Sequence, residues 1–431
     1  MLTESERRLL AINDRAKVHL FGQELQDKSF AVCKADMLIK GQDTSNIACD
    51  DTLTNDHFAD RRFDYVVANP PYGVDWTESK DAVEKEHARG FAGRFGAGLP
   101  GKVDGQLLFL QHMVAKAKTA DEGGGRVAVV LNGSPLFSGD AGSGESNVRK
   151  WLFEQDLVEA IIGLPNQLFY NTGINTYVWV LTTKKRPERQ GLVQLVDARD
   201  LFAKMSKSLG DKRNELDHSH IADITNLFES FAETEKSKIL RNEDFGYTKV
   251  VIDRPLRLRY EATEDTPSLL MQSKALAKLS DERRAAILAA AEASGSWATP
   301  DRAEAEKRVA AWVEVDGKST KAVRDAALSA VSVPDPEGEP VLAKNGFVRD
   351  SSLGDTEAVP LTQDIEEYLK QEVIPFAADA VANRAKDKVG YEIPFTRIFY
   401  TYTPPRDLAD IDADIRASQQ RVLELLTEVR E

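Results

Sequence analysis

The chain has 431 residues, and 42% of them are hydrophobic, which is enough to build the cores of two domains. No apolar stretch approaches the roughly 18 residues that a membrane span needs, and no signal-peptide pattern is present, so we expect a cytoplasmic protein without membrane contact. The formal net charge of −14 opposes binding of nucleic acid over the whole surface, because phosphate contact needs clustered Lys and Arg. Any such contact must come from a local patch or from a partner.

The cysteine content argues against a disulfide framework and against a cysteine metal site. Cys33 and Cys49 are the only two, which is too few for a disulfide framework, and neither has the paired spacing of a metal site. We expect both to be structural, and we expect no bound metal.

Between residue 18 and about residue 183, short apolar runs alternate with helical patterns, as in a parallel sheet with crossover helices. The expected strands are Val18–Phe21, Asn46–Cys49, Tyr65–Ala68, Val127–Leu131, Ala160–Leu164 and Tyr177–Thr182. The expected helices include Ser29–Ile39, Gln106–Thr119 and Ser146–Glu154. Residues 1–254 are therefore predicted to form a doubly wound, Rossmann-like α/β domain.

A local excess of basic residues lies between Arg199 and Arg213, where they outnumber the two acids Asp200 and Asp211. The candidate nucleic-acid contacts in this stretch are Lys204, Lys207, Lys212 and Arg213. A merely solvated helix face is the alternative interpretation.

After residue 254, Ala-rich charged helices such as Ser280–Ala293 and Asp301–Val313 predict a mainly helical region over 255–403. Pro and Gly residues indicate a flexible loop within it near 333–358. The terminal segment 404–431 carries a stripe at alternating three- and four-residue steps: Leu408, Ile411, Ile415, Ser418, Val422, Leu425 and Val429. This spacing predicts a coiled-coil-type helix that packs either on its own domain or on a partner.

Asn69-Pro70-Pro71-Tyr72 directly follows the apolar run 63–68, which places it at the carboxyl end of a strand, where open α/β sheets bind their ligands. The Asn69 side-chain oxygen and the Pro70 carbonyl are two acceptors that can hold the two N–H groups of an exocyclic amine and aim its lone pair at a methyl donor. Pro70 and Pro71 stiffen the loop. The motif therefore predicts methyl transfer to an amine.

Tyr72 supplies an aromatic face, which suits a base flipped out of a duplex, because a paired and stacked base is out of reach. The combination predicts an adenine-N6 DNA methyltransferase that uses S-adenosylmethionine, with Asn69, Pro70, Pro71 and Tyr72 as catalytic residues. A cytosine-C5 enzyme would instead need a Cys nucleophile, typically after Pro, and neither cysteine follows a proline.

Acids that follow the two preceding strands are the candidate cofactor ligands besides Asn69. Glu24 has the position of the carboxylate that holds ribose hydroxyls in dinucleotide-type folds, and its alternative is a helix-start acid near Asp27. Asp51 can accept a hydrogen bond from the adenine amine of the cofactor, and the adjacent Asp50 stays open as an alternative.

Several longer stretches of the sequence carry a family resemblance. They are Phe21–Glu24, Cys33–Leu38, Asn69–Trp76, Asp104–His112, Leu131–Phe137, Phe169–Ile174, Arg199–Phe202 and Gly390–Arg397. Together they resemble the modification subunit of type I restriction-modification systems, whereas residues 260–355 match it only loosely. The resemblance implies methylation of double-stranded DNA in a complex with two partners. These are a DNA-specificity subunit, which we expect to dock on the C-terminal helix, and a restriction subunit that translocates and cleaves DNA.

The chain departs from that family at its start. Family members carry an N-terminal helical domain, then a strand and a Gly-rich cofactor loop, whereas Met1-Leu2-Thr3-Glu4 looks like the residues that follow that loop. We therefore expect an N-terminal truncation that removes the first strand and the loop, and no measurable activity from this chain alone. Gly139–Glu145 is an alternative Gly-rich loop in a permuted order, although Asn132–Ser138 separate it from its strand.

Two other functions stay open. A protein-glutamine N-methyltransferase uses the same tetrapeptide, because an amide nitrogen poses a similar chemical problem. A non-catalytic assembly subunit would keep the surfaces for DNA and partners without binding cofactor.

Overall fold

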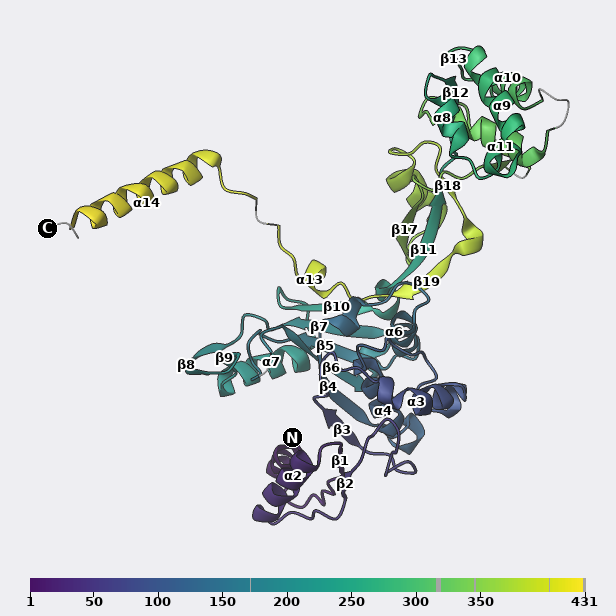
Figure 1. Cartoon of the computed structure of the whole chain (residues 1–431). Helices are drawn as coiled ribbons and strands as arrows, with labels where there is room; N and C mark the ends of the chain where they lie inside the picture. The colour runs from purple at the N-terminus through teal and green to yellow at the C-terminus, as the bar shows by residue number, and fades with distance from the viewer. Residues whose placement is uncertain (171, 315–318, 345, 403, 429–431) are drawn as a thin grey trace. The chain divides into compact units, whose positions relative to one another are not determined.

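The computed structural model describes residues 1–431 except 171, 315–318, 345, 403 and 429–431 (Figure 1). The chain divides into two compact units. The first contains residues 1–139, 144–242 and 392–431, and the second contains residues 140–143 and 243–391. Within the described part of the chain, no helix combines the length and the apolar character that crossing a membrane requires.

The first unit is built on a six-stranded mixed sheet with the order β10-β7-β5-β6-β4-β3. Its strands are β3 (Tyr65–Ala68), β4 (Arg126–Asn132), β5 (Val158–Gly163), β6 (Thr176–Thr182), β7 (Leu192–Asp197) and β10 (Ser237–Arg241). β3, β4, β5 and β7 run in one direction, and β6 and β10 run against their neighbours. β5 is buried along its whole length, as expected for a strand covered on both faces. The carboxyl ends of the four parallel strands therefore share one edge of the sheet.

The helices of this unit include α3 (Lys80–His87), α4 (Gln106–Lys116), α5 (Ser134–Phe137), α6 (Gly144–Glu154) and α7 (His218–Ser230). α4 packs on β3 and β4, and α7 packs on β7. α4 was expected to continue to Thr119 but ends at Lys116, because the Lys118 N–H donates to the Phe63 carbonyl at 2.9 Å. The chain leaves the helix there to pair with the segment that leads into β3.

A separate parallel pair, β1 (Gly22–Glu24) with β2 (Ile47–Cys49), accompanies α1 (Leu2–Ile12) and α2 (Asp27–Ile39). The first predicted strand, Val18–Phe21, is wrong, because strand pairing begins only at Gly22.

The Phe21 ring packs instead against Phe58 and Phe63, with ring centroids 5.4 Å and 5.2 Å away. An aromatic cluster, and not strand pairing, shields the end of that apolar run. The other predicted strands are confirmed to within two residues at each end. The sequence prediction missed β7, β10 and the hairpin of β8 (Ala203–Leu209) and β9 (Lys212–Glu215).

The second unit is centred on the long strand β11 (Gly246–Asp253). It pairs antiparallel with β17 (Asp355–Pro360), β18 (Val381–Ala382) and β19 (Lys388–Tyr391). One face of this sheet packs on the segment that contains α12 (Ile365–Tyr368). The hairpin of β15 (Leu342–Ala343) and β16 (Gly346–Phe347) lies in the predicted Pro/Gly-rich loop.

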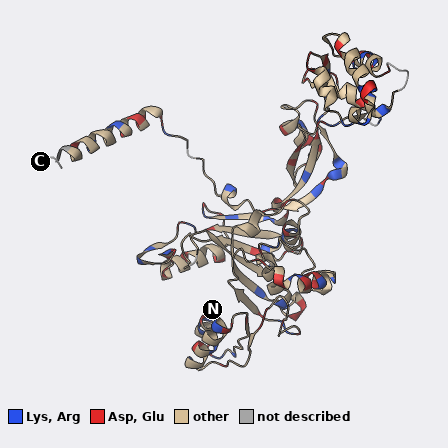
Figure 2. Cartoon of the chain, viewed as in Figure 1, with Lys and Arg blue, Asp and Glu red and all other residues tan. Residues whose placement is uncertain are grey.

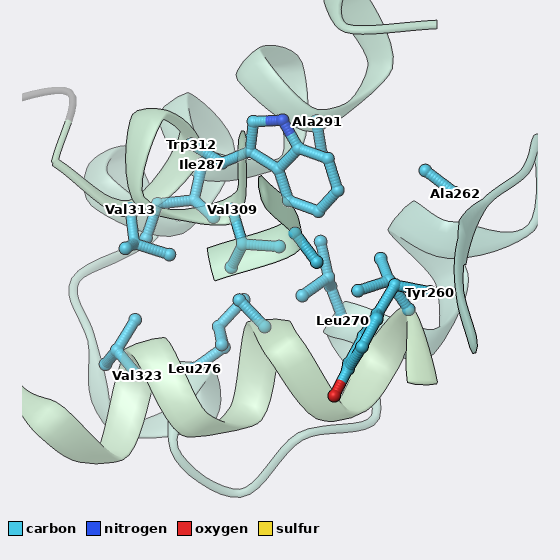
Figure 3. Packing of buried hydrophobic residues seen from close by; sticks show 13 residues of the cluster. Tyr260, Ala262, Leu270, Leu276, Ile287, Ala291, Val309, Trp312, Val313 and Val323 are labelled. Atoms are coloured by element: carbon cyan, nitrogen blue, oxygen red, sulfur yellow. The ribbon is translucent and has the colours of Figure 1, made fainter. Parts of the chain in front are cut away.

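A helical bundle is inserted between β11 and β17. Its helices are α8 (Thr266–Met271), α9 (Asp281–Ala293), α10 (Arg302–Val313) and α11 (Lys321–Ala330). They pack on a small sheet of β12 (Leu258–Ala262), β13 (Trp297–Thr299) and β14 (Ser332–Pro334). Figure 3 shows their common core, in which Trp312, Ile287 and Leu270 are almost fully buried. The insertion thus has a hydrophobic core of its own.

The predicted description of 255–403 as mainly helical is wrong outside this bundle, because the chain on both sides of it is extended. The second unit also begins before β11, whereas the boundary was expected after residue 254. Both differences have one cause: β11 pairs with strands more than a hundred residues further along the chain, and local periodicity does not report such pairing. The remaining helices are α13 (Phe395–Ile398) and α14 (Leu408–Glu428).

Candidate active site

The loop Asn69–Tyr72 leaves the carboxyl end of β3. Pro70 is buried, whereas Asn69 is exposed to solvent. The Tyr72 hydroxyl donates a hydrogen bond to Asn69 Oδ1 at 2.6 Å. Burial raises the pKa of Tyr72 to about 12, so this hydroxyl stays protonated and remains a donor at neutral pH. The loop therefore presents an amide and a phenol that are in direct contact.

The residues after this loop are fastened to the segment before α4. The Trp76 N–H donates to the Lys102 carbonyl at 3.0 Å, and the indole Nε1 donates to the Gly101 carbonyl at 3.1 Å. Gly73, between the loop and Trp76, has a φ of +61°, which favours glycine. Trp76 is buried, so the loop is anchored on its carboxyl side by packing as well as by hydrogen bonds.

The predicted cofactor acids lie at the carboxyl ends of β1 and β2. Because the strands are parallel and Glu24 pairs with Cys49, Glu24 and the two acids after Cys49 lie at the same edge. Glu24 Oε1 also accepts a hydrogen bond from the Gln26 N–H at 3.0 Å, at the start of α2. Glu24 therefore also has the alternative role of an acid at the start of a helix.

Asp50 and Asp51 differ in the number of internal hydrogen bonds that their carboxylates accept. Asp50 accepts from the Asp51 N–H at 2.8 Å and from the side chains of Asn55 and His57 at 2.6 Å and 3.0 Å. The hydrogen bond from His57 is the main cause that lowers the Asp50 pKa. Asp51 accepts from the Leu53 N–H at 2.9 Å and from the Ser79 hydroxyl at 2.8 Å.

Two contacts join the loop that follows β2 (residues 50–59, the acid loop) to the segment that follows the Asn69–Tyr72 loop. Ser79, which donates to Asp51, lies shortly after Tyr72 in the chain. Leu53 and Trp76 belong to one buried cluster with Val83, Phe95 and Leu108. The structure therefore brings the loop that follows β2 against the segment that follows β3.

The basic stretch forms the hairpin β8–β9, so its interpretation as a helix face is wrong. Lys and Arg residues appear along this hairpin in Figure 2. The hairpin is bound to the loop that follows β5, because the N–H groups of Arg213 and Asn214 donate to the Gln167 carbonyl at 3.0 Å and 3.1 Å. It therefore lies beside a loop from the same sheet edge as Asn69. Lys212 Nζ lies 5.5 Å from the centre of the Tyr170 ring.

A pocket of about 300 Å³ opens in this hairpin. It is lined by Gln167, Lys204, Met205, Ser208, Arg213 and Asn214. Lys204 and Arg213 are exposed, and Asn214 is buried. Among the described residues, neither Lys204 nor Arg213 makes an ion pair, so both charges are available to an anion.

The alternative Gly-rich loop has a packing role. A Cβ atom on Gly144 would lie 1.7 Å from the Leu99 carbonyl oxygen, so only glycine fits there. Asp140 forms an ion pair with Lys249 of β11. The loop serves close packing before α6.

Sequence reasoning missed a polar pair at the end of β4. Gln106 is almost fully buried, its Nε2 donates to Asn132 Oδ1 at 3.0 Å, and the Asn132 N–H donates to Gln106 Oε1 at 2.9 Å. The sequence did contain a signal for this pair: Asn132 is the last residue of β4, just as Asn69 directly follows β3, so both amides lie at the carboxyl ends of strands. Among the described residues, no cluster of three or more His, Cys, Asp and Glu is arranged to hold a metal ion.

The carboxyl end of β3 carries an amide and an aromatic ring, and the loop after β2, with its acids, packs against the segment that follows them. Open α/β sheets bind their ligands at this edge, so the fold and the site define an α/β domain with a candidate ligand site there. The model of the N-6 DNA Methylase family matches residues 1–253. The chain belongs to this family.

Curated relatives are methylase subunits of type I restriction enzymes. The MjaIX methylase subunit of Methanocaldococcus jannaschii is 27% identical over 250 residues, which cover 58% of this chain and 41% of the relative. The HindI methylase subunit of Haemophilus influenzae is 27% identical over 242 residues, which cover 54% of this chain and 51% of the relative. The chain thus spans about half the length, or less, of the curated relatives it matches.

Two solved structures are also similar. The type I restriction-modification system methyltransferase subunit from Streptococcus thermophilus has a TM-score of 0.44 and 29% identity, over 52% of this chain and 45% of that chain. A modification subunit of a putative type I restriction enzyme from Vibrio vulnificus YJ016 has a TM-score of 0.41 and 16% identity, over 52% of this chain and 44% of that chain.

Proposed function

We propose that the chain is the catalytic subunit of an adenine-N6 DNA methyltransferase of the type I restriction-modification kind, with S-adenosylmethionine as methyl donor. The observation that carries the proposal is the Asn69–Tyr72 loop, which follows β3 inside the segment matched by the N-6 DNA Methylase family. The names of the curated relatives support the type of system.

The chemistry rests on two acceptors in the loop. Asn69 Oδ1 and the Pro70 carbonyl oxygen accept the two N–H bonds of the adenine amine, which turns its lone pair out of conjugation with the ring. When bound, S-adenosylmethionine would supply an electrophilic methyl group on a positively charged sulfur and would leave as the neutral thioether. Asn69 and Pro70 would hold the amine with its lone pair towards that methyl group, and the surplus proton of the methylated amine would pass to water. Pro70 and Pro71 hold the acceptors still.

Tyr72 holds the flipped adenine by stacking. Asn69 Oδ1 accepts the Tyr72 hydroxyl and has a second lone pair, so it can accept an adenine N–H beside that hydroxyl or in its place.

Glu24 and Asp51 fit the cofactor, because carboxylates accept hydrogen bonds from ribose hydroxyls and from an adenine amine. A carboxylate has about four lone-pair sites. Three internal donors reach Asp50 and two reach Asp51, so Asp51 keeps more capacity for a ligand. This difference supports Asp51 over Asp50.

The hairpin β8–β9 is the proposed contact with the phosphates of double-stranded DNA. Its candidate residues are Lys204, Lys207, Lys212 and Arg213. The pocket lined by Lys204 and Arg213 also has amide side chains in its wall. These groups are hydrogen-bond donors, and a phosphate oxygen can accept hydrogen bonds from them.

The proposed protein partners are a DNA-specificity subunit on α14 and a restriction subunit. In α14, Ile415, Val422 and Leu425 of the predicted stripe are exposed, and Val429 lies outside the described residues. A hollow along the helix is lined by Ile411, Ile415, Ser418 and Val422, among others. An exposed apolar stripe of this spacing suits a coiled-coil partner. We place the assembly in the cytoplasm.

Substitution Asn69→Ala tests the function. In an otherwise active complex it should lower the rate of adenine methylation roughly a hundredfold or more, the scale for loss of one preorganised polar group. DNA binding should persist, since Asn69 acts on the reacting amine and not on phosphates. Near-normal methylation would refute the assignment. Titration of S-adenosylmethionine into the wild-type complex separates an enzyme from an assembly subunit without cofactor, and a methylated glutamine in a protein substrate would mark the other alternative.

A further inference from the structure

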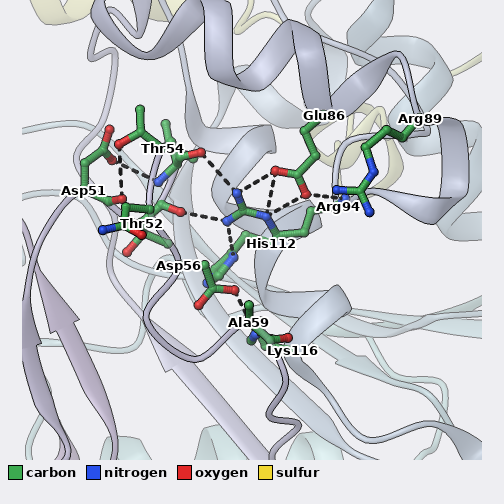
Figure 4. Close-up of polar contacts among 12 residues, drawn as sticks. Asp51, Thr52, Thr54, Asp56, Ala59, Glu86, Arg89, Arg94, His112 and Lys116 are labelled. Carbon is green, nitrogen blue, oxygen red and sulfur yellow. Dashed lines mark hydrogen bonds and ion pairs between the residues drawn. The ribbon is translucent and has the colours of Figure 1, made fainter.

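Arg94 uses its full hydrogen-bonding capacity. A guanidinium carries five N–H donors, and each one on Arg94 has an acceptor within 3.1 Å. Figure 4 shows the polar contacts around Arg94 as dashed lines. The side chain is only 14% exposed. It also lies over the ring of the buried Phe95, 4.8 Å from the ring centre. Because all five donors are hydrogen-bonded and the guanidinium packs on an aromatic ring, the orientation of the Arg94 side chain is fixed.

Three of these hydrogen bonds anchor Arg94 to helices. Glu86 of α3 accepts two of them, at 2.8 Å and 2.6 Å. His112 of α4 accepts the third through Nδ1 at 3.0 Å. Burial first, and then the positive charge of Arg94, lower the pKa of His112 to about 4, so its ring is neutral and can accept at neutral pH.

The other two hydrogen bonds hold the acid loop. The Arg94 guanidinium donates to the Thr52 carbonyl at 2.7 Å and to the Leu53 carbonyl at 3.1 Å. These are the two carbonyls directly after Asp51. The same short segment closes back on Asp51, because the Leu53 N–H donates to its carboxylate and the Asn55 N–H donates to its carbonyl at 2.8 Å. Movement of residues 52 and 53 would therefore move the Asp51 carboxylate.

A second cation holds the far end of the same loop. Lys116 of α4 donates to Asp56 at 2.8 Å and to the carbonyls of Phe58 and Ala59. The Lys116 and Asp56 side chains are 6% and 10% exposed. α4 thus fixes the loop at two points, through His112 and Arg94 at one end and through Lys116 at the other.

We propose that Arg94 is a positioning residue for the cofactor: it fixes the carbonyls of Thr52 and Leu53 and thereby sets the Asp51 carboxylate for the adenine end of S-adenosylmethionine. The inference rests on the proposed function for its ligand. Lysine cannot replace Arg94, because an ammonium has three donors and cannot span two carbonyls, Glu86 and His112 together.

The test is Arg94→Lys, with Arg89→Lys as the matched control. Arg89 is an exposed arginine shortly before Arg94, and its guanidinium donates to the Ala92 carbonyl. Hydrogen exchange of the full chain reports the loop directly: in Arg94→Lys, the amides of Leu53 and Asn55 should exchange at least tenfold faster, while β5 keeps its protection. In the active complex, the Kd for S-adenosylmethionine should rise about tenfold or more, and kcat at saturating cofactor should stay within about twofold.

Each other result has a definite meaning. Unchanged exchange at Leu53 and Asn55 in Arg94→Lys would overturn the positioning role without touching the proposed function. Faster exchange with an unchanged Kd would show that the loop does not serve the cofactor, and would overturn the proposal. A wild-type complex that does not bind S-adenosylmethionine would refute the proposed function and this inference with it. Glu86→Gln provides a second variant if Arg94→Lys does not fold, because it weakens the anchor of Arg94 and should raise the same exchange rates.

Discussion

The Tyr72 hydroxyl donates its hydrogen bond to the same Asn69 oxygen that is proposed to receive the substrate amine, at 2.6 Å. The proposed acceptor is thus kept satisfied by a neighbour three residues away. An amide oxygen has two lone pairs, so Asn69 Oδ1 can accept an adenine N–H either beside the Tyr72 hydroxyl or in place of it. In both cases this oxygen stays hydrogen-bonded when adenine enters, while the ring of Tyr72 remains available for stacking.

This relationship predicts different outcomes for two substitutions at Tyr72. Tyr72→Phe keeps the ring and frees Asn69, so capture of the flipped base should be as tight as in the wild type or tighter. Tyr72→Ala should lose the stacking, worth roughly 1–3 kcal/mol per base. A fluorescent adenine analogue at the target position reports extrusion directly. Equal behaviour of the Ala and Phe variants would show that stacking is not the role of Tyr72.

The hairpin β8–β9 should govern the salt dependence of DNA binding. If Lys204 and Arg213 each contact a phosphate, Lys204→Ala and Arg213→Ala should each reduce the slope of log K against log salt concentration by about one. Both should weaken binding of all sequences alike, because phosphates carry no sequence information. The exposed Lys307 of α10 is the control. An unchanged slope in both hairpin variants would exclude this hairpin from the DNA contact.

His112 should make the stability of the fold depend on pH in a defined window. Its pKa is about 4 in the folded chain, against an ordinary value of 6.5, because of burial and the nearby charges of Arg94 and Lys116, which outweigh the acids Asp56 and Glu86. Between these values the unfolded chain binds a proton that the folded chain does not, so the free energy of unfolding should fall as the pH is lowered from 6.5 towards 4. Above pH 6.5 this contribution is constant.

His112→Asn isolates this effect, since an amide oxygen can accept the Arg94 hydrogen bond but does not titrate. Urea unfolding of both proteins at pH 7.5 and pH 5 gives the comparison, in which the titration of the carboxylates common to both largely cancels. The wild type should lose more stability than His112→Asn on acidification. An equal loss would mean that His112 is not neutral in the folded protein.

The stripe on α14 should bind the specificity subunit. Deletion of residues 405–431 should leave the α/β unit folded, because the described residues of α14 contribute no buried side chain to it. Val422→Glu in the stripe should abolish co-purification of the partner, while Gln420→Glu, on the opposite face of the helix, should preserve it. Retention of the partner after the deletion would place its binding site elsewhere.

The sequence by itself determined the elements whose signals are local. The β-branched run before Asn69 and the two prolines after it specify a strand that ends in a stiff loop, and β3 has the predicted bounds. The apolar steps between Leu408 and Leu425 likewise specify a helix, and α14 covers them. In these cases the residues that define the element also supply its hydrogen bonds or its rigidity.

Tertiary structure alone decided the features that depend on distant partners. Val18–Phe21 has the composition of a strand, but Phe58 and Phe63 offer the Phe21 ring an aromatic cluster instead. β11 acquires its role from strands that follow the helical bundle, and Arg94 acquires its role from carbonyls that precede it by about forty residues. The physical reason is common to all three. Periodicity and composition indicate that a side chain will be buried or will need a hydrogen-bond partner. Which group buries it or bonds to it is decided only when remote segments of the chain come together.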